Sequence, residues 1–81
     1  MHARFTVDIE GRLRQLERHY RATLSASVAA KASYLALVGE PSALPPTVDR
    51  AKERWQQLDA LKRGIASEMA ELEELEHEST T

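Results

Sequence analysis

The sequence contains no cysteine, which excludes a disulfide framework and any thiolate metal site. Aromatic residues make up only 5% of the chain, and glycine and proline occur three times each in 81 residues. No apolar run approaches the roughly 18 residues that a membrane-spanning helix needs, and no signal peptide precedes the first charged residues. We therefore expect a single small domain in the cytoplasm.

Neither sign of charge dominates the composition. The chain has 11 Lys and Arg residues against 13 Asp and Glu residues, a formal net charge of −2. A nucleic-acid-binding domain is usually strongly basic, so this balance does not favour nucleic acid as the partner.

All three prolines and Gly39 lie within residues 39–47. Glycine just past a helix end accepts a left-handed conformation, whereas proline blocks continuation but suits the first turn of the next helix. The cluster predicts a first helix over about residues 6–38, with Thr6 as N-cap, a hinge over 39–47 and a second helix over about 47–77. No strand-like alternation of useful length occurs.

Large apolar residues recur at helical spacing on both sides of the hinge, with a mean period of about 3.6 in the first helix and about 3.5 in the second. In the first helix they are Ile9, Leu13, Leu16, Tyr20, Leu24, Val28, Leu35 and Val38. In the second they are Val48, Ala51, Trp55, Leu58, Leu61, Ile65, Met69, Leu72 and Leu75. We expect these two stripes to face each other.

A hinge of this length suits antiparallel neighbours. Positions whose numbers add up to about 85 would then be opposite, and Lys31 would lie on the indole of Trp55. The same arrangement places five arginines within residues 4–21 beside six glutamates within residues 64–81. The predicted fold class is an all-α, coiled-coil-like, antiparallel two-helix hairpin over residues 1–81.

Residues 22–38 contain a single charge, Lys31. Away from the predicted seam, small residues follow one another at a spacing of four and three, and small side chains let another helix approach closely. The predicted partner-binding residues are Ala22, Ala26, Ala29, Ser33, Tyr34, Ala36 and Leu37. The alternative is an exposed alanine face, because alanine is the best helix former. Gly64 has the same two interpretations in the second helix.

Two helices alone enclose no core, so we expect the hairpin to associate. The partner is either a second copy, which would give a four-helix bundle, or a different helical protein. The expected function is a small, non-catalytic protein–protein interaction or assembly module of the adaptor or co-chaperone type. The alternative is nucleic-acid binding through a basic face made of Arg12, Arg14, Arg18, Arg21, Lys62 and Arg63.

No motif for catalysis is present: the sequence has no glycine-rich phosphate loop and no nucleophile elbow. None of His2, His19 and His77 has the spacing of a metal-binding pair on a helix. We therefore expect no enzyme, no cofactor, no metal and no small-molecule substrate.

The second helix contains the segment Trp55-Gln-Gln-Leu-Asp-Ala-Leu-Lys-Arg-Gly-Ile-Ala66. With the proline-marked hinge before it, this segment resembles the small helical-hairpin co-chaperones of type III secretion needle subunits. The resemblance covers less than a quarter of the chain, and the acidic tail and longer first helix depart from that pattern. It implies a cytoplasmic, non-catalytic role beside a tetratricopeptide-like chaperone.

Overall fold

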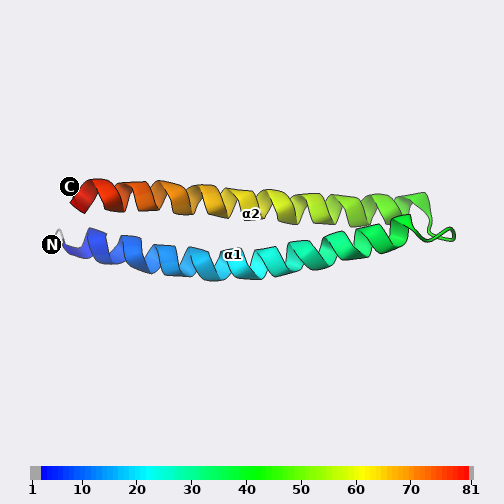
Figure 1. The fold of residues 1–81 in the computed structure, drawn as a ribbon, viewed down its shortest axis with the longest axis horizontal. Coiled ribbons are helices and arrows are strands. Elements are labelled where there is room, and N and C mark those ends of the chain that lie inside the picture. The colour runs from blue at the N-terminus through cyan, green and yellow to red at the C-terminus, as the bar shows by residue number, and fades with distance from the viewer. Residues whose placement is uncertain (1–2, 81) are drawn as a thin grey trace.

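The computed structural model describes residues 3–80, with side-chain exposure for residues 9–78. It contains two helices, α1 (Ala3–Val38) and α2 (Pro45–Thr80), and no strand within the described residues. The helices lie side by side and antiparallel along their whole length, so both termini are at one end and the hinge at the other (Figure 1). The molecule is a rod of 61 × 16 × 14 Å. The predicted all-α hairpin is confirmed.

Both helices extend beyond their expected outer ends. Because α1 already begins at Ala3, the interpretation of Thr6 as its N-cap is wrong. The second helix continues to Thr80 rather than ending near residue 77. No proline or glycine interrupts either extension, so the backbone hydrogen bonds continue. The remaining tail residues, 1–2 and 81, lie outside the described residues.

Residues 39–44 connect the helices, a shorter hinge than the expected 39–47. The amide of Gly39 donates to the carbonyl of Leu35 (3.2 Å), and the amide of Glu40 donates to that of Leu37 (3.1 Å). The expected left-handed glycine is wrong, because no described residue has a positive φ. The chain instead leaves α1 through hydrogen bonds that tighten its last turn.

The start of α2 explains why the hinge is short. The amides of Thr47 and Val48 donate to the carbonyl of Leu44 at 3.0 and 3.1 Å. Pro45 and Pro46 therefore occupy the first turn, where a missing N–H costs no hydrogen bond. Proline ends the hinge because its fixed φ already suits a helix.

The seam between the helices follows a strict alternation of three and four residues in both, a period of about 3.5. In α1 the buried and half-buried seam positions are Ile9, Leu13, Leu16, Tyr20, Thr23, Ser27, Ala30, Tyr34 and Leu37. In α2 they are Val48, Ala51, Trp55, Leu58, Lys62, Ile65, Met69, Leu72 and Glu76. The two series mirror each other about the hinge.

The predicted register is confirmed by a contact between the helices. The Nζ atom of Lys31 lies 5.6 Å from the ring centroid of Trp55, as expected from the pairing of positions whose numbers add up to about 85. A cation over an exposed indole contributes about 0.5–1 kcal/mol.

The predicted composition of the seam is wrong between Tyr20 and the hinge. A stripe with a period of 3.6 drifts by about 20° per heptad from a two-helix seam. Four of the large aliphatic residues after Tyr20 are therefore rotated out of the seam, and Thr23, Ser27 and Ala30 lie in it before Tyr34 and Leu37. In α2, Leu61 and Leu75 are exposed in the same way, beside Lys62 and Glu76 in the seam.

Candidate interaction surface

The interior of the hairpin is small. Among the described residues only Leu16, Ala30 and Ile65 form a buried apolar core, and Ser27 is the buried polar residue. No described large side chain is completely buried. In the hinge half the fully buried positions are a serine and an alanine, and the large seam side chains there, such as Trp55 and Leu58, are only half-buried.

Four large aliphatic side chains lie outside the seam in this hinge half. They lie in one strip on one flank of α1, interrupted at Lys31, which we name the aliphatic stripe: Leu24, Val28, Leu35 and Val38. Their exposed fractions are 38%, 61%, 55% and 56%. Full burial of one such side chain contributes about 1.5–3 kcal/mol, so this flank offers a partner several favourable contacts.

The predicted small residues lie on the opposite flank of the same segment. Ala22, Ala29, Ser33 and Ala36 are exposed and Ala26 is half-buried. A groove of about 310 Å³ crosses this flank, and its lining residues are Ala26, Ala29, Ala30, Ser33, Ala51 and Arg54. The groove exists because small side chains leave space between the helices.

Tyr34 and Leu37 belong to the seam, which corrects their assignment to a partner surface. The ring of Tyr34 stacks on Trp55 with centroids 5.7 Å apart and planes 15° from parallel. Leu37 is half-buried one turn further along. The three–four alternation that begins at Ile9 reaches positions 34 and 37, but the sequence alone does not show that this series, rather than the one with a period of 3.6, forms the seam.

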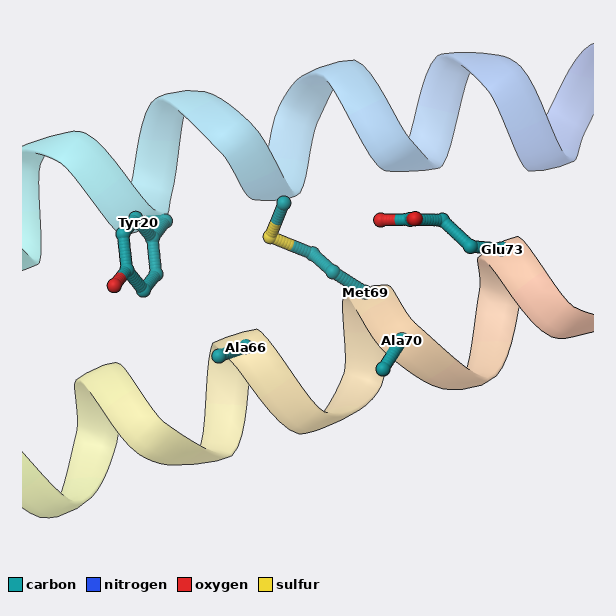
Figure 2. Close-up of a pocket in the computed structure, with 5 residues that line it drawn as sticks. All are labelled: Tyr20, Ala66, Met69, Ala70 and Glu73. Atoms are coloured by element: carbon teal, nitrogen blue, oxygen red, sulfur yellow. The ribbon is translucent and has the colours of Figure 1, made fainter.

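A second hollow, of about 190 Å³, opens between the helices further from the hinge. It is lined by Tyr20, Ala66, Met69, Ala70 and Glu73, and the Met69 side chain reaches from α2 toward α1 (Figure 2). Leu24 directly follows the seam residue Thr23, and Ala66 directly follows the seam residue Ile65 at the equivalent heptad position of α2. The hollow and the aliphatic stripe therefore lie on the same flank of the hairpin. Sequence reasoning missed this hollow.

Arg12 joins the basic start of α1 to the acidic end of α2. Its Nη2 and Nε atoms donate to Oε2 of Glu68 at 2.8 and 3.1 Å. Both side chains are about half exposed, so the pair contributes about 0–1 kcal/mol. This contact supports the expected placement of the arginines of residues 4–21 beside the glutamates of residues 64–81.

Two residues of the basic face form ion pairs with an aspartate on their own helix. Nζ of Lys62 lies 3.0 Å from Oδ1 of Asp59, and Nη2 of Arg63 lies 2.9 Å from Oδ2. The hydrogen bond from Lys62 is the main reason why the pKa of Asp59 is lowered; desolvation opposes it, and the charges of Lys62, Arg63 and Lys31 add to the lowering. These contacts weaken the case for an anion-binding surface there.

Among the described residues, no three His, Asp or Glu side chains come close enough together to hold a metal ion. No helix in that part of the chain is long and apolar enough to cross a membrane. Comparison of the chain with known protein families, curated proteins and solved structures finds no match. The resemblance to type III co-chaperones therefore stays a prediction.

Proposed function

We propose that this chain is a small, non-catalytic protein–protein interaction module of the adaptor or co-chaperone type, and that the hinge half of α1 is its interface. The observation that carries the proposal is the aliphatic stripe, four large apolar side chains left outside the seam. The small-residue flank beside it gives the same helix a second face suited to close packing.

The total exposed surface supports association. The chain exposes 6363 Å². A compact monomer of 9.1 kDa exposes about 4,900 Å², so this hairpin leaves roughly 1,500 Å² more in water. The excess is total surface, polar and apolar together, and the exposed aliphatic stripe is the apolar part of it that is typical of an interaction site.

The partner that fits this surface is a helix or a helix pair. A row of apolar side chains spaced by three and four residues packs into the groove of another helix. Lys31 is the single charge between residues 22 and 38, and its cation lies over Trp55. A helical partner therefore meets little charge that it must desolvate.

Nucleic-acid binding is the second candidate. Arg14, Arg18 and Arg21 are exposed on α1, outside the seam. However, Arg12 pairs with Glu68, and the two residues that α2 contributes to the basic face, Lys62 and Arg63, pair with Asp59. The remaining three arginines give a weak, salt-sensitive phosphate-binding surface at most.

Site-specific photo-cross-linking in the cells that make the protein tests the proposed interface. A photoreactive residue is placed at Val28, on the aliphatic stripe, and in a control at Ser25, three residues away on the exposed outer face. We expect a discrete cross-linked protein product from position 28 and none from position 25. Absence of a product at position 28, or equal products at both positions, contradicts the proposed function.

A further inference from the structure

We propose that the aliphatic stripe binds the same stripe of a second copy, antiparallel, across a two-fold axis at Lys31, so that two hairpins form a four-helix bundle. This inference rests on the proposed function and names the partner of that surface. It is carried by the spacing of the stripe, by the charges around it and by the exposed area.

The stripe is nearly self-complementary. Leu24 and Val38 each lie seven residues from Lys31, and Val28 and Leu35 lie three residues before it and four after it. Reversing one copy therefore places Leu24 against Val38 of the second copy and Val28 against Leu35 of the second copy. A closed two-fold interface requires this property, because the same patch must serve both sides.

Lys31 tolerates a position on the axis. Its Nζ atom lies 5.6 Å from the ring centroid of Trp55, so the cation is turned toward its own seam. Asp59, whose pKa the charge of Lys31 helps to lower, provides a nearby negative charge. The two lysines of a dimer are each paired within their own hairpin before the copies meet.

The second hairpin contributes its α1 because the matching flank of α2 is polar. In the hinge half, that flank carries Asp49, Lys52, Gln56, Asp59 and Arg63. Burying an aliphatic stripe against such residues leaves polar groups without water, which weakens the contact. Another aliphatic stripe is the apolar surface of matching length that the chain itself provides.

Charge selects the antiparallel orientation. A parallel pair would place Arg14 and Arg21 beside their own copies, and like charges repel. The antiparallel pair instead brings Arg21 to the level of the second copy's hinge, which carries Glu40. At an exposed site the difference in electrostatic energy between the two orientations is small for each pair of charges, but it favours the antiparallel dimer at both ends of the interface.

The same arrangement accounts for the hinge leucine. Leu44 is 67% exposed, the most exposed large apolar side chain among the described residues. In the antiparallel dimer the hinge of one copy reaches the level of Tyr20 in the other, where the hollow of about 190 Å³ opens on the flank that also carries the aliphatic stripe. Leu44 of the second copy therefore has an apolar hollow within reach.

The area is sufficient for a specific dimer. A standard protein–protein interface removes about 800 Å² from each partner. The hairpin exposes roughly 1,500 Å² beyond a compact monomer of its mass, so one such interface fits within the excess.

Cysteine cross-linking of the purified chain tests both the partner and its orientation, because the chain contains no cysteine of its own. One preparation carries Leu24→Cys and another, distinguished by a tag, carries Val38→Cys. A short bismaleimide spans the 8–10 Å between packed helices. We expect dimers by sedimentation, cross-links when the two preparations are mixed, and none from Leu24→Cys alone.

Ser25→Cys on the outer face is the matched control and should not cross-link. Val28→Lys should weaken the dimer by about 100-fold while the helix content stays unchanged, since residue 28 is exposed in the single hairpin. Cross-links between two Leu24→Cys chains would contradict the antiparallel arrangement. If the chain stays monomeric at several hundred micromolar, the partner is not a second copy. In that last case a photo-cross-link from Val28 in cells would leave the proposed function standing.

Discussion

The two halves of the hairpin use their residues in opposite ways. In the half near the termini, the large apolar residues of α1 lie in the seam, as Leu16 does against a helix that contributes Ile65. In the hinge half the seam of α1 begins with Thr23, Ser27 and Ala30 before it reaches Tyr34 and Leu37, and four large aliphatic residues lie outside it. The first half stabilises the hairpin, and the second half presents apolar surface to a partner.

This contrast shows that an apolar stripe does not by itself identify the inner face of a helix. Up to Tyr20 the aliphatic series and the heptad coincide, but after Tyr20 they separate. A helix with small residues toward its neighbour and large residues toward solvent reverses the usual distribution. We interpret the reversal as a division of α1 into a folding half and a binding half.

The largest expected effect on the free energy of unfolding comes from a substitution at Leu16, in the half near the termini. Leu16→Ala removes a side chain that is 4% exposed and should lower the free energy of unfolding by about 2–3 kcal/mol. Leu61→Ala is the control, because Leu61 is 54% exposed in the hinge half and should cost about 0.5 kcal/mol or less. Urea denaturation of both variants, below the concentration at which copies associate, measures the difference. Equal losses would contradict the division into two halves.

A second test separates the two flanks of the binding half. Val28→Glu places a carboxylate in the aliphatic stripe and should weaken self-association by about 100-fold or more. Ala29→Glu places the same group on the small-residue flank, where it should leave the dimer intact and change hairpin stability by a few tenths of a kcal/mol. Sedimentation and thermal melts of the two variants compare them directly. If Ala29→Glu dissociates the dimer and Val28→Glu does not, the interface lies on the small-residue flank instead.

Gly64 gives a third test, on α2. A Cβ added there meets nothing within 4 Å, so the hairpin itself gives no reason for a glycine. Gly64→Ala should raise the free energy of unfolding by about 1 kcal/mol, through helix propensity alone. Gly11→Ala is the matched control, since its Cβ also meets nothing within 4 Å. If Gly11→Ala raises the free energy of unfolding but Gly64→Ala weakens association, a partner helix packs closely against Gly64.

The hinge and the register could be predicted from the sequence because they depend on local chemistry. Three prolines within residues 39–47 fix the place of the turn, and a short hinge between long helices fixes antiparallel pairing. The contact between Lys31 and Trp55 follows from that register alone.

The candidate site could not be predicted in the same way. Choosing between a period of about 3.5 and about 3.6 requires the geometry of two packed helices, and the choice rotates the apolar residues after Tyr20 off the seam. Sequence reasoning therefore assigned Leu24 and Val28 to the interior and Tyr34 to the surface, and the structure reverses these assignments. In α1 the error grows with distance from the shared origin near Ile9, so it falls in the hinge half, whereas in α2 it also includes Leu75 near the termini.

The half near the termini allows a smaller test through its charges. Arg12→Gln removes the ion pair with Glu68 and should lower the free energy of unfolding by about 0.5 kcal/mol at low salt. Raising the ionic strength to about 0.5 M should abolish most of that difference, because exposed charges are screened. Arg14→Gln, an exposed arginine close by, is the control. A loss that does not depend on salt would mean that Arg12 acts through packing of its aliphatic stem.

The smallest effect concerns Asp59, which lies on α2 in the hinge half. Lys62 lowers its pKa by a hydrogen bond, so the folded chain holds the carboxylate more readily than the unfolded chain does. The stabilisation is therefore fully present above the unfolded pKa of 3.8 and is lost as the pH falls through the lower folded value. Asp59→Asn should make the free energy of unfolding less dependent on pH below about pH 4. Asp49→Asn is the control, since Asp49 makes no ion pair with the described residues. Chemical denaturation of the two variants at pH 5 and at pH 3 measures the effect, and an equal acid sensitivity in both would show that the Lys62 hydrogen bond does not couple to folding.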